Sequence, residues 1–491
     1  MKYPFLFLLT TLLVSCGGNH PSEPREFNVV EFQPTLYPDY TDVTIPCNIA
    51  PMNFMVLNPS VDACVARIES NAGVLTVGEG RKVQIPQKDW ERAIHSTRDG
   101  SLAITLYTHA DGVWRRHPTF RMEVAPDEVD PWLSYRLIEP SYVAYEDLDI
   151  MQRNLSNFEE KIIASNHVGQ RKEQCINCHS YQNYHTENML YHVRGAGGGT
   201  MLTYKGQSRL MTAMRRDGMM SNPVYPAWHP TLPLIAFSTN LTGQLFHTQS
   251  IAKVEVQDKA SALVLYDVER DTMFQLPHTP ERLDNFPTWA PDGRRLYYTS
   301  ALYEARDTTV NTSRDMANNY QDVKYNLYYR DFDPDRLAFG EEHLLLDLQS
   351  MNQSASLPRV SPDGKSLLYA SGLFGCFHVW HPDADIRLLH LDSLFAGRPD
   401  SLALDKLLPL NSSRAESYPS WSSNGRWITF ISRRTDGNYS RVYMAYYDAE
   451  GQVHKPFVLP QSDPEHDRLL LRSYNRPELM VEGVSPTLPL D

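Results

Sequence analysis

The chain has 491 residues, enough for two or three domains, and 46 lysines and arginines against 59 aspartates and glutamates give it a formal net charge of −13. An acidic chain of this kind is a poor ligand for nucleic acid or for anionic lipid headgroups, so we expect neither as a partner. Six cysteines are few for an exported protein.

Residues 1–15 predict a secretory leader. Lys2 supplies its charge, and residues 5–14 form an apolar run that is too short for a bilayer needing about 20 residues. Leu13-Val-Ser-Cys16 ends this run and resembles the lipobox of bacterial lipoproteins. The resemblance implies lipidation of Cys16, with residues 16–30 as a flexible lipidated tether.

Residues 31–140 predict a small antiparallel β-sandwich-like domain without a chemical motif. Apolar and polar residues alternate there at period two between turn residues. Cys47 and Cys64 fall in this domain and could form a disulfide, whereas Cys376 is expected to be a buried thiol. The expected strands are residues 43–45, 74–77, 82–85, 102–107 and 119–124.

Residues 141–185 predict a short haem-binding segment, partly helical over 145–163. Cys175-Ile-Asn-Cys178-His179 has the C-x-x-C-H spacing at which two thiols form thioethers to haem and the histidine binds the iron. We therefore expect one covalent haem c, with Cys175 and Cys178 as attachment points and His179 as the proximal iron ligand. Two alternatives stay open: a redox dithiol, which favours a βαβ context, and a zinc site, to which His185 could contribute.

The sixth iron ligand decides between electron transfer and catalysis. His192 is the leading candidate, because it interrupts a blade-like strand at the position where the next repeat has Ser238. The alternative is a histidine that simply lines the propeller channel. Other candidates are His167, His185, Met189, Met201, Met211 and Met214.

A repeat dominates residues 186–485. Trp228, Trp289, Val360 and Trp421 each follow a proline by two residues and precede a tight turn and an apolar strand. Intervals of 61, 71 and 61 residues suit four-stranded propeller blades. Residues 188–204 predict a degenerate first blade, and residues 463–485 are expected to close the ring with an N-terminal strand.

The repeats resemble the blades of TolB-like and dipeptidyl-peptidase-like propellers, which implies a mainly β fold with about six blades. G-x-S-x-G and H-E-x-x-H are absent from the sequence, so the resemblance brings no hydrolase domain. A propeller hosts many functions, and the fold alone does not name one.

Leader, haem motif and repeats together resemble bacterial lipoproteins that join a monohaem cytochrome c segment to a TolB-like propeller. This resemblance implies haem binding and one-electron transfer in the cell envelope, with the propeller as a docking platform for a redox protein. The expected location is the periplasmic face of the outer membrane, through the lipid anchor. Two alternatives remain: a propeller that binds or senses a ligand with a structural haem, and a haem enzyme with an open iron site.

Overall fold

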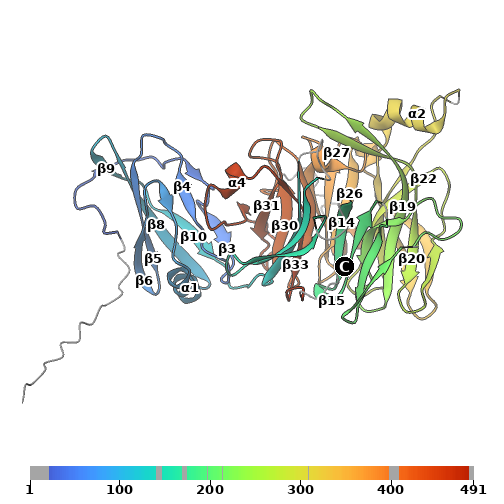
Figure 1. Ribbon diagram of the computed structural model, residues 1–491, viewed down its shortest axis with the longest axis horizontal. Helices are drawn as coiled ribbons and strands as arrows, with labels where there is room; N and C mark the ends of the chain where they lie inside the picture. The colour runs from blue at the N-terminus through green and yellow to red at the C-terminus, as the bar shows by residue number, and fades with distance from the viewer. Residues whose placement is uncertain are drawn as a thin grey trace, which may run out of the picture.

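The computed structural model describes residues 21–139, 146–167, 174–195, 197–212, 214–307, 309–397 and 408–485. The fold is mainly β, with a smaller N-terminal domain beside a β-propeller (Figure 1). None of the helices in these ranges is long and apolar enough to cross a membrane. The leader and Cys16 lie outside the described residues.

The N-terminal domain contains a seven-stranded sheet and a three-stranded sheet. The large sheet comprises β1 (Asn28–Val29), β3 (Val43–Ile45), β5 (Ala63–Ser70), β6 (Gly73–Val77), β8 (Gly100–Ala110), β9 (Val113–Arg116) and β10 (Phe120–Val124). The small sheet comprises β2 (Leu36–Tyr37), β4 (Phe54–Val56) and β7 (Lys82–Val83).

Two features of this domain differ from the expected antiparallel sandwich. Strands β1 and β9 pair in parallel, as do β10 and β3. Helix α1 (Gln87–Ser96) also follows Pro86, with Trp90, Ala93 and Ile94 on its buried face. Buried residues three and four apart are the mark of a helix, which a search for period-two alternation does not detect.

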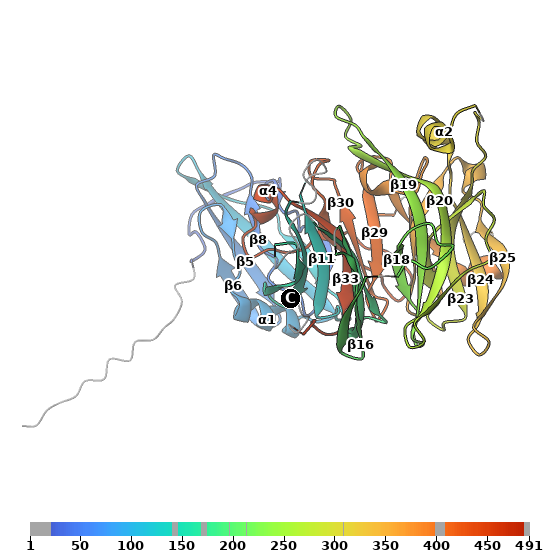
Figure 2. The same ribbon diagram turned by 45° about the vertical axis from the view of Figure 1, so that its right-hand side comes forward.

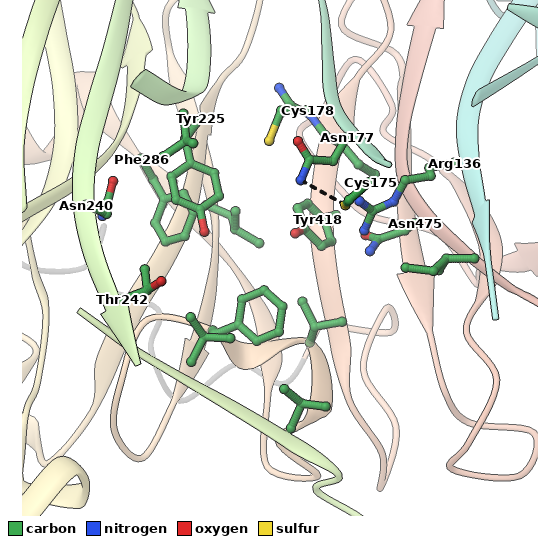
Figure 3. A pocket seen from close by; sticks show the side chains of 18 of the residues that line it. Arg136, Cys175, Asn177, Cys178, Tyr225, Asn240, Thr242, Phe286, Tyr418 and Asn475 are labelled. Atoms are coloured by element: carbon green, nitrogen blue, oxygen red, sulfur yellow. Dashed lines mark hydrogen bonds between the residues drawn. The ribbon is translucent and has the colours of Figure 1, made fainter. Parts of the chain in front are cut away.

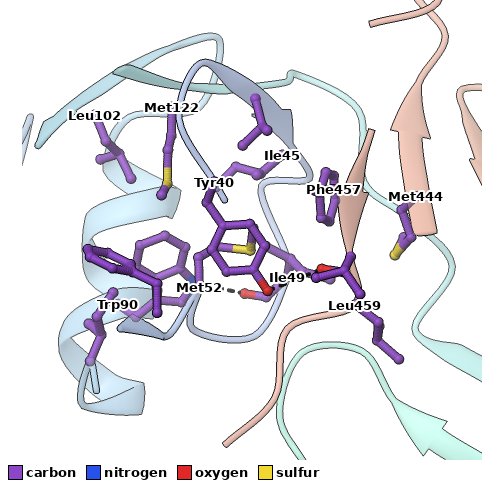
Figure 4. Packing of buried hydrophobic residues seen from close by; sticks show 14 of the residues in the cluster. Tyr40, Ile45, Ile49, Met52, Trp90, Leu102, Met122, Met444, Phe457 and Leu459 are labelled. Carbon is purple, nitrogen blue, oxygen red and sulfur yellow. Dashed lines mark hydrogen bonds between the residues drawn. The ribbon is translucent and has the colours of Figure 1, made fainter. Parts of the chain in front are cut away.

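The N-terminal domain and the propeller share one hydrophobic core (Figure 4). Trp90 of α1 donates a hydrogen bond to the carbonyl of Ile49 at 2.9 Å. Tyr40 donates to the carbonyl of Val458 at 3.1 Å, and Phe457 and Met444 of the propeller pack into the same cluster. The domain is therefore a fixed attachment to one side of the propeller.

The propeller has six blades in the part of the chain that the structure describes. Blade 1 is β11 (Trp132–Ile138), β12 (Leu148–Asn154), β13 (Glu160–Ser165) and β33 (Ser473–Met480); blade 2 is β14 (Cys175–Gln182), β15 (His185–Arg194), β16 (Gly199–Tyr204) and β17 (Gln207–Met211); blade 3 is β18 (Pro223–Trp228), β19 (Leu234–Phe246), β20 (Val254–Asp267) and β21 (Thr272–Gln275). Blade 4 is β22 (Arg282–Trp289), β23 (Arg295–Leu302), β24 (Asn326–Asp333) and β25 (Ala338–Leu346); blade 5 is β26 (Ser354–Val360), β27 (Ser366–Gly372) and β28 (Asp385–His390); blade 6 is β29 (Glu416–Trp421), β30 (Trp427–Ser432), β31 (Arg441–Tyr446) and β32 (Phe457–Val458). Short helices α2 (Thr312–Asn319), α3 (Leu391–Phe395) and α4 (His466–Leu469) lie in loops, with 3₁₀ turns at Tyr320–Asp322, Gln349–Met351 and His378–Trp380.

The ring closes through the C-terminal strand, as the sequence predicts. β33 pairs antiparallel with β11, so that one blade combines strands from both ends of the propeller. The propeller therefore begins at β11, earlier than the boundary expected at residue 186. The segment expected to be partly helical forms β12 and β13 instead, because these strands complete the blade that β33 and β11 begin.

The inner strands of the six blades share a left-handed residue. Each inner strand contacts the inner strand of the next blade, and each contains a break in register at the same point of the blade. The residue at that point has φ between 48° and 57°. These six residues, which we call the channel ring, are Cys178, Tyr225, Phe286, Leu357, Tyr418 and Arg476.

A long hairpin formed by β19 and β20 crosses one face of the propeller (Figures 1 and 2). Val254, near its end, packs against Val379 and Trp380 of blade 5 and Ile431 of blade 6. Glu255 accepts a hydrogen bond from the His381 ring at 2.5 Å, and both side chains are buried. We call residues 240–257 the strap, because they connect blade 3 to the blades across the channel.

Candidate functional site

A cavity of about 490 Å³ lies between the channel ring and the strap. All six residues of the channel ring line it, together with Asn240, Thr242 and Gln244 of the strap. Its volume falls within the range of sites for small molecules and cofactors. Figure 3 shows that its walls come from several blades, with Tyr225 and Phe286 on one side and Tyr418, Arg136 and Cys175 on the other.

The C-x-x-C-H motif occupies the channel-ring position of blade 2. In the other five blades a proline follows the ring residue: Pro226, Pro287, Pro358, Pro419 and Pro477. In blade 2 the ring residue is Cys178, and His179 stands where the others have proline. Because the bulge re-aims side chains that a regular strand would alternate, Cys175, Cys178 and His179 all line the same cavity.

His179 is fully buried (0% exposed). Neither ring nitrogen makes a hydrogen bond of normal distance and angle to a described residue. The backbone of Arg476 lies beside the ring and offers it at most a weak hydrogen bond. Burial lowers the pKa of His179 to about 3, so that its imidazole is neutral near pH 7. A neutral, buried imidazole that lacks a firm hydrogen-bond partner has the properties of a metal ligand.

The two thiols of the motif are both free. Cys175 is buried, its sulfur lies 3.7 Å from the amide nitrogen of Asn177, and burial raises the pKa of its thiol. The sulfur of Cys178 points into the space between Tyr225 and Tyr418 (Figure 3). Both sulfurs are therefore accessible to a group that occupies the cavity.

These residues are compatible with a covalently attached haem. Two free thiols and an imidazole without a firm partner converge on one cavity, as haem c attachment requires. Aromatic rings supply apolar walls for a flat macrocycle, and five arginines around the cavity could face its carboxylates. The cavity is lined by the arginines Arg136, Arg194, Arg359, Arg433 and Arg476.

The structure does not bring His192 to this cavity. His192 pairs with Asn177 in blade 2, and Ser238 pairs with Val224 in blade 3. Asn177 and Val224 each precede the channel-ring residue of their blade, so the alignment of His192 with Ser238 is confirmed. The His192 side chain, however, points between blades 2 and 3. Its ring packs 6.0 Å from Phe237 between centroids, and Nδ1 is 2.8 Å from the hydroxyl of Thr200.

The other proposed sixth ligands also lie away from the cavity. Exposed His167 lies 2.9 Å from Asp147 and exposed His185 lies 3.5 Å from Glu482. Among the described residues that line the cavity, His179 is the single histidine, and none is a methionine. The buried or half-buried methionines Met189, Met201, Met211 and Met214 belong to the hydrophobic clusters on either side of blade 2.

The other three cysteines of the described residues are free thiols. Cys47 and Cys64 are separate buried thiols and form no disulfide with each other. Cys376 is a buried thiol, as expected, 3.6 Å from a carboxylate oxygen of Asp258. Within the described ranges, no group of three or more histidine, cysteine, aspartate or glutamate side chains is arranged to hold a metal ion.

Sequence reasoning missed most of the cavity wall, although one signal was available. The channel-ring residue is the residue before proline in five blades, so the repeat itself marks Tyr225, Phe286, Leu357, Tyr418 and Arg476. The repeat gives no such signal for Arg136, which pairs with Asn475 across blade 1, or for Arg433, which follows β30.

Fold and site together define a six-bladed β-propeller whose central cavity is lined by two thiols and an imidazole. No known protein-family profile matches the chain, and no curated protein matches it in sequence.

Similar solved structures include tricorn protease, at 12% identity and TM-score 0.34, covering 87% of this chain and 35% of that chain. They also include a puromycin-hydrolysing peptidase of Mycobacterium tuberculosis (11%, TM-score 0.34, 86% and 57%). A third is an oligogalacturonate lyase of Vibrio parahaemolyticus (11%, TM-score 0.30, 82% and 94%). This chain thus spans about a third of the length of tricorn protease, and similarity at this level supports no argument about function.

Proposed function

We propose that this protein is a c-type haem protein of the cell envelope, with haem attached through Cys175 and Cys178 and bound at the iron by His179. The observation that carries the proposal is the convergence of both thiols and the buried His179 imidazole on one cavity. When bound, haem supplies one-electron redox chemistry or ligand binding at iron. The protein's own part is to anchor the group, orient the proximal imidazole and enclose both under the strap.

Electron transfer to a redox protein of the envelope is the role that the sequence resemblance implies, with the propeller faces as the docking surface. A second role is favoured by the composition of the cavity. Because no methionine or second histidine from the described residues lines it, the iron would keep a position open to a small ligand. A protein with an open iron site would bind or transform that ligand, whereas ligation by a second side chain would restrict it to carrying electrons.

The absorption spectrum separates these roles. We expect a high-spin spectrum and a shift of the Soret band on adding cyanide, because the cavity offers His179 alone. A low-spin spectrum that does not change on adding cyanide would instead indicate an electron carrier whose sixth iron ligand comes from elsewhere in the chain.

His192→Ala is expected to leave the spin state and the Soret band unchanged, since its ring lies between blades 2 and 3. His179→Ala is the matched comparison in the same blade, and it should change the spectrum while the thioethers hold the haem in place. The measurement is absorption spectroscopy of both variants, oxidised and reduced. A change of spin state in His192→Ala would return His192 to the position of distal ligand.

Lipid anchoring through Cys16 completes the proposal, and the lipobox-like Leu13-Val-Ser-Cys16 supports it. Cys16→Ala is expected to move the protein from the membrane fraction to the soluble fraction, or to leave its leader uncleaved. Cys47→Ala, which changes a buried thiol of the first folded domain, should partition like the wild type. Fractionation followed by immunoblotting measures both. If Cys16→Ala stays processed and membrane-bound, the anchor is not at this residue.

A further inference from the structure

The charge of the cavity is opposite to that of the protein. The whole chain carries a formal charge of −13, yet five arginines line the cavity and Glu139 is the single acidic residue among its described lining residues. Glu478, just outside, binds Arg359 at 3.1 Å and Arg476 at 3.0 Å. One carboxylate thus serves two arginines, and low-dielectric walls strengthen the field of the positive charge that remains.

Two of the cavity arginines have no carboxylate partner among the described residues. The backbone of Arg136 pairs within blade 1, but its guanidinium makes no hydrogen bond or ion pair with the described residues. Arg433 is 4% exposed, and its guanidinium lies 3.4 Å from the centroid of the Trp380 ring. Its Nε donates to the carbonyl of Val379 at 2.8 Å and Nη1 donates to the carbonyl of Asn438. Nη2 has no acceptor in the described part of the chain, so one edge of the Arg433 guanidinium is free to bind a ligand.

A purely structural role does not explain the partners of Arg433. Arg441, in the same blade, is a buried arginine whose partners do fit a structural role. It is equally buried and donates to four main-chain carbonyls, but its guanidinium lies 4.0 Å from the carboxylate of Asp467 and does not line the cavity. Arg433 has no such counter-ion. Burial is the largest cause that lowers the pKa of Arg433 to about 9, and the negative charge of Asp436 offsets it only in part.

The walls beside these arginines are aromatic. Trp380 stacks on Arg433 and packs under the strap against Val254. Phe377, Tyr418 and Phe286 continue the apolar surface toward the channel ring. Flat rings beside an unneutralised guanidinium are the complement of a molecule that has a flat apolar body and a carboxylate.

We propose that Arg433 and Arg136 make the cavity a binding site for an organic anion with a flat apolar body and a carboxylate group. Two sources share this chemistry. One is the haem of the proposed function, whose propionates would meet the arginines, and this source rests on that proposal. The other is a separate aromatic carboxylate that enters the cavity under the strap, and this source stands whether or not haem is attached.

The test uses the full chain matured with a haem-attachment system, benzoate as the probe, and Arg433→Gln as the variant. Benzoate affinity is measured by calorimetry in chloride-free buffer at low ionic strength, and the haem midpoint potential by spectroelectrochemistry. If a separate carboxylate is the ligand, wild-type protein binds benzoate and the variant binds it at least tenfold more weakly. If the propionates occupy the site, the haem-loaded protein does not bind benzoate, and the variant has a lower potential because a positive charge that disfavours the oxidised haem is lost.

The control is Arg441→Gln, a buried arginine of the same blade outside the cavity, with melting temperatures of both variants to report folding. Benzoate is also titrated into Cys175→Ala with Cys178→Ala. There, binding that depends on Arg433 supports the anion site even if the haem proposal fails, because haem staining is read separately. The anion site is overturned if Arg433→Gln alters neither benzoate affinity nor potential, or alters them no more than Arg441→Gln does.

Discussion

Replacing both Cys175 and Cys178 by alanine is expected to abolish covalent haem completely while the propeller stays folded. The two sulfurs are the attachment points, and both line the cavity as free thiols. The measurement is haem-dependent peroxidase staining of a denaturing gel, on which wild-type protein should stain. Each single substitution leaves one thioether and should retain a weaker stain.

Cys64→Ala is the control, because it removes a buried thiol from the N-terminal domain, outside the cavity lining, and should stain like the wild type. Circular dichroism of the double variant reports whether the blades remain. Persistent staining of a folded double variant would falsify covalent attachment at this motif, and an unstained wild type would end the haem proposal altogether.

The sequence predicts the propeller well because its repeat is redundant. Three tryptophans and Val360 mark the inner strands of four blades, and the predicted closing strand is β33. Blades 1 and 2 are harder to recognise, because Leu479 and Tyr181 stand where the other blades have tryptophan or valine. Without that mark, β11 is assigned to the N-terminal domain and β12 and β13 to a partly helical segment, so the predicted start of the propeller is too late.

The sequence predicts that Cys175, Cys178 and His179 lie together, but it does not predict the geometry around them. Cys175, Cys178 and His179 are adjacent in sequence, so spacing alone brings them together. His192 is close in sequence to the motif and lies on the neighbouring strand, but a blade has two faces and its ring packs on the face toward blade 3. Sequence proximity therefore says little about a sixth ligand, because the bulge at Cys178 changes the direction of side chains within two residues.

The arginines of the cavity could not be predicted as a group from the sequence either. Arg136 and Arg433 lie almost 300 residues apart and meet at one cavity only because the ring closes. Contacts of this kind depend on which blades face each other across the channel, which no local pattern encodes. The proposed anion site consequently became visible only in three dimensions.

Trp289→Ala and Trp421→Ala are each expected to destabilise the protein by about 3–5 kcal/mol, the usual cost of removing a large buried aromatic side chain. Trp289 is 7% exposed and Trp421 2%. Each indole packs against strands of the preceding blade and donates a 3.2 Å hydrogen bond to its inner strand, at Ala227 and Arg359 respectively. Removing either ring would empty a site between blades and leave a carbonyl without its donor.

The measurement is urea unfolding followed by far-UV circular dichroism, which does not depend on the deleted chromophore. Trp114→Ala is the matched control, because that half-buried indole of the N-terminal domain contacts His109 at its surface and should cost about 1 kcal/mol or less. Trp289→Phe and Trp421→Phe, which refill part of the space, should recover part of the loss. Blade 5 already carries Val360 at this position, so the ring tolerates one small residue there. If both alanine variants unfold within about 1 kcal/mol of the wild type, the indoles do not hold neighbouring blades together, and the inter-blade role assigned to the repeat is wrong.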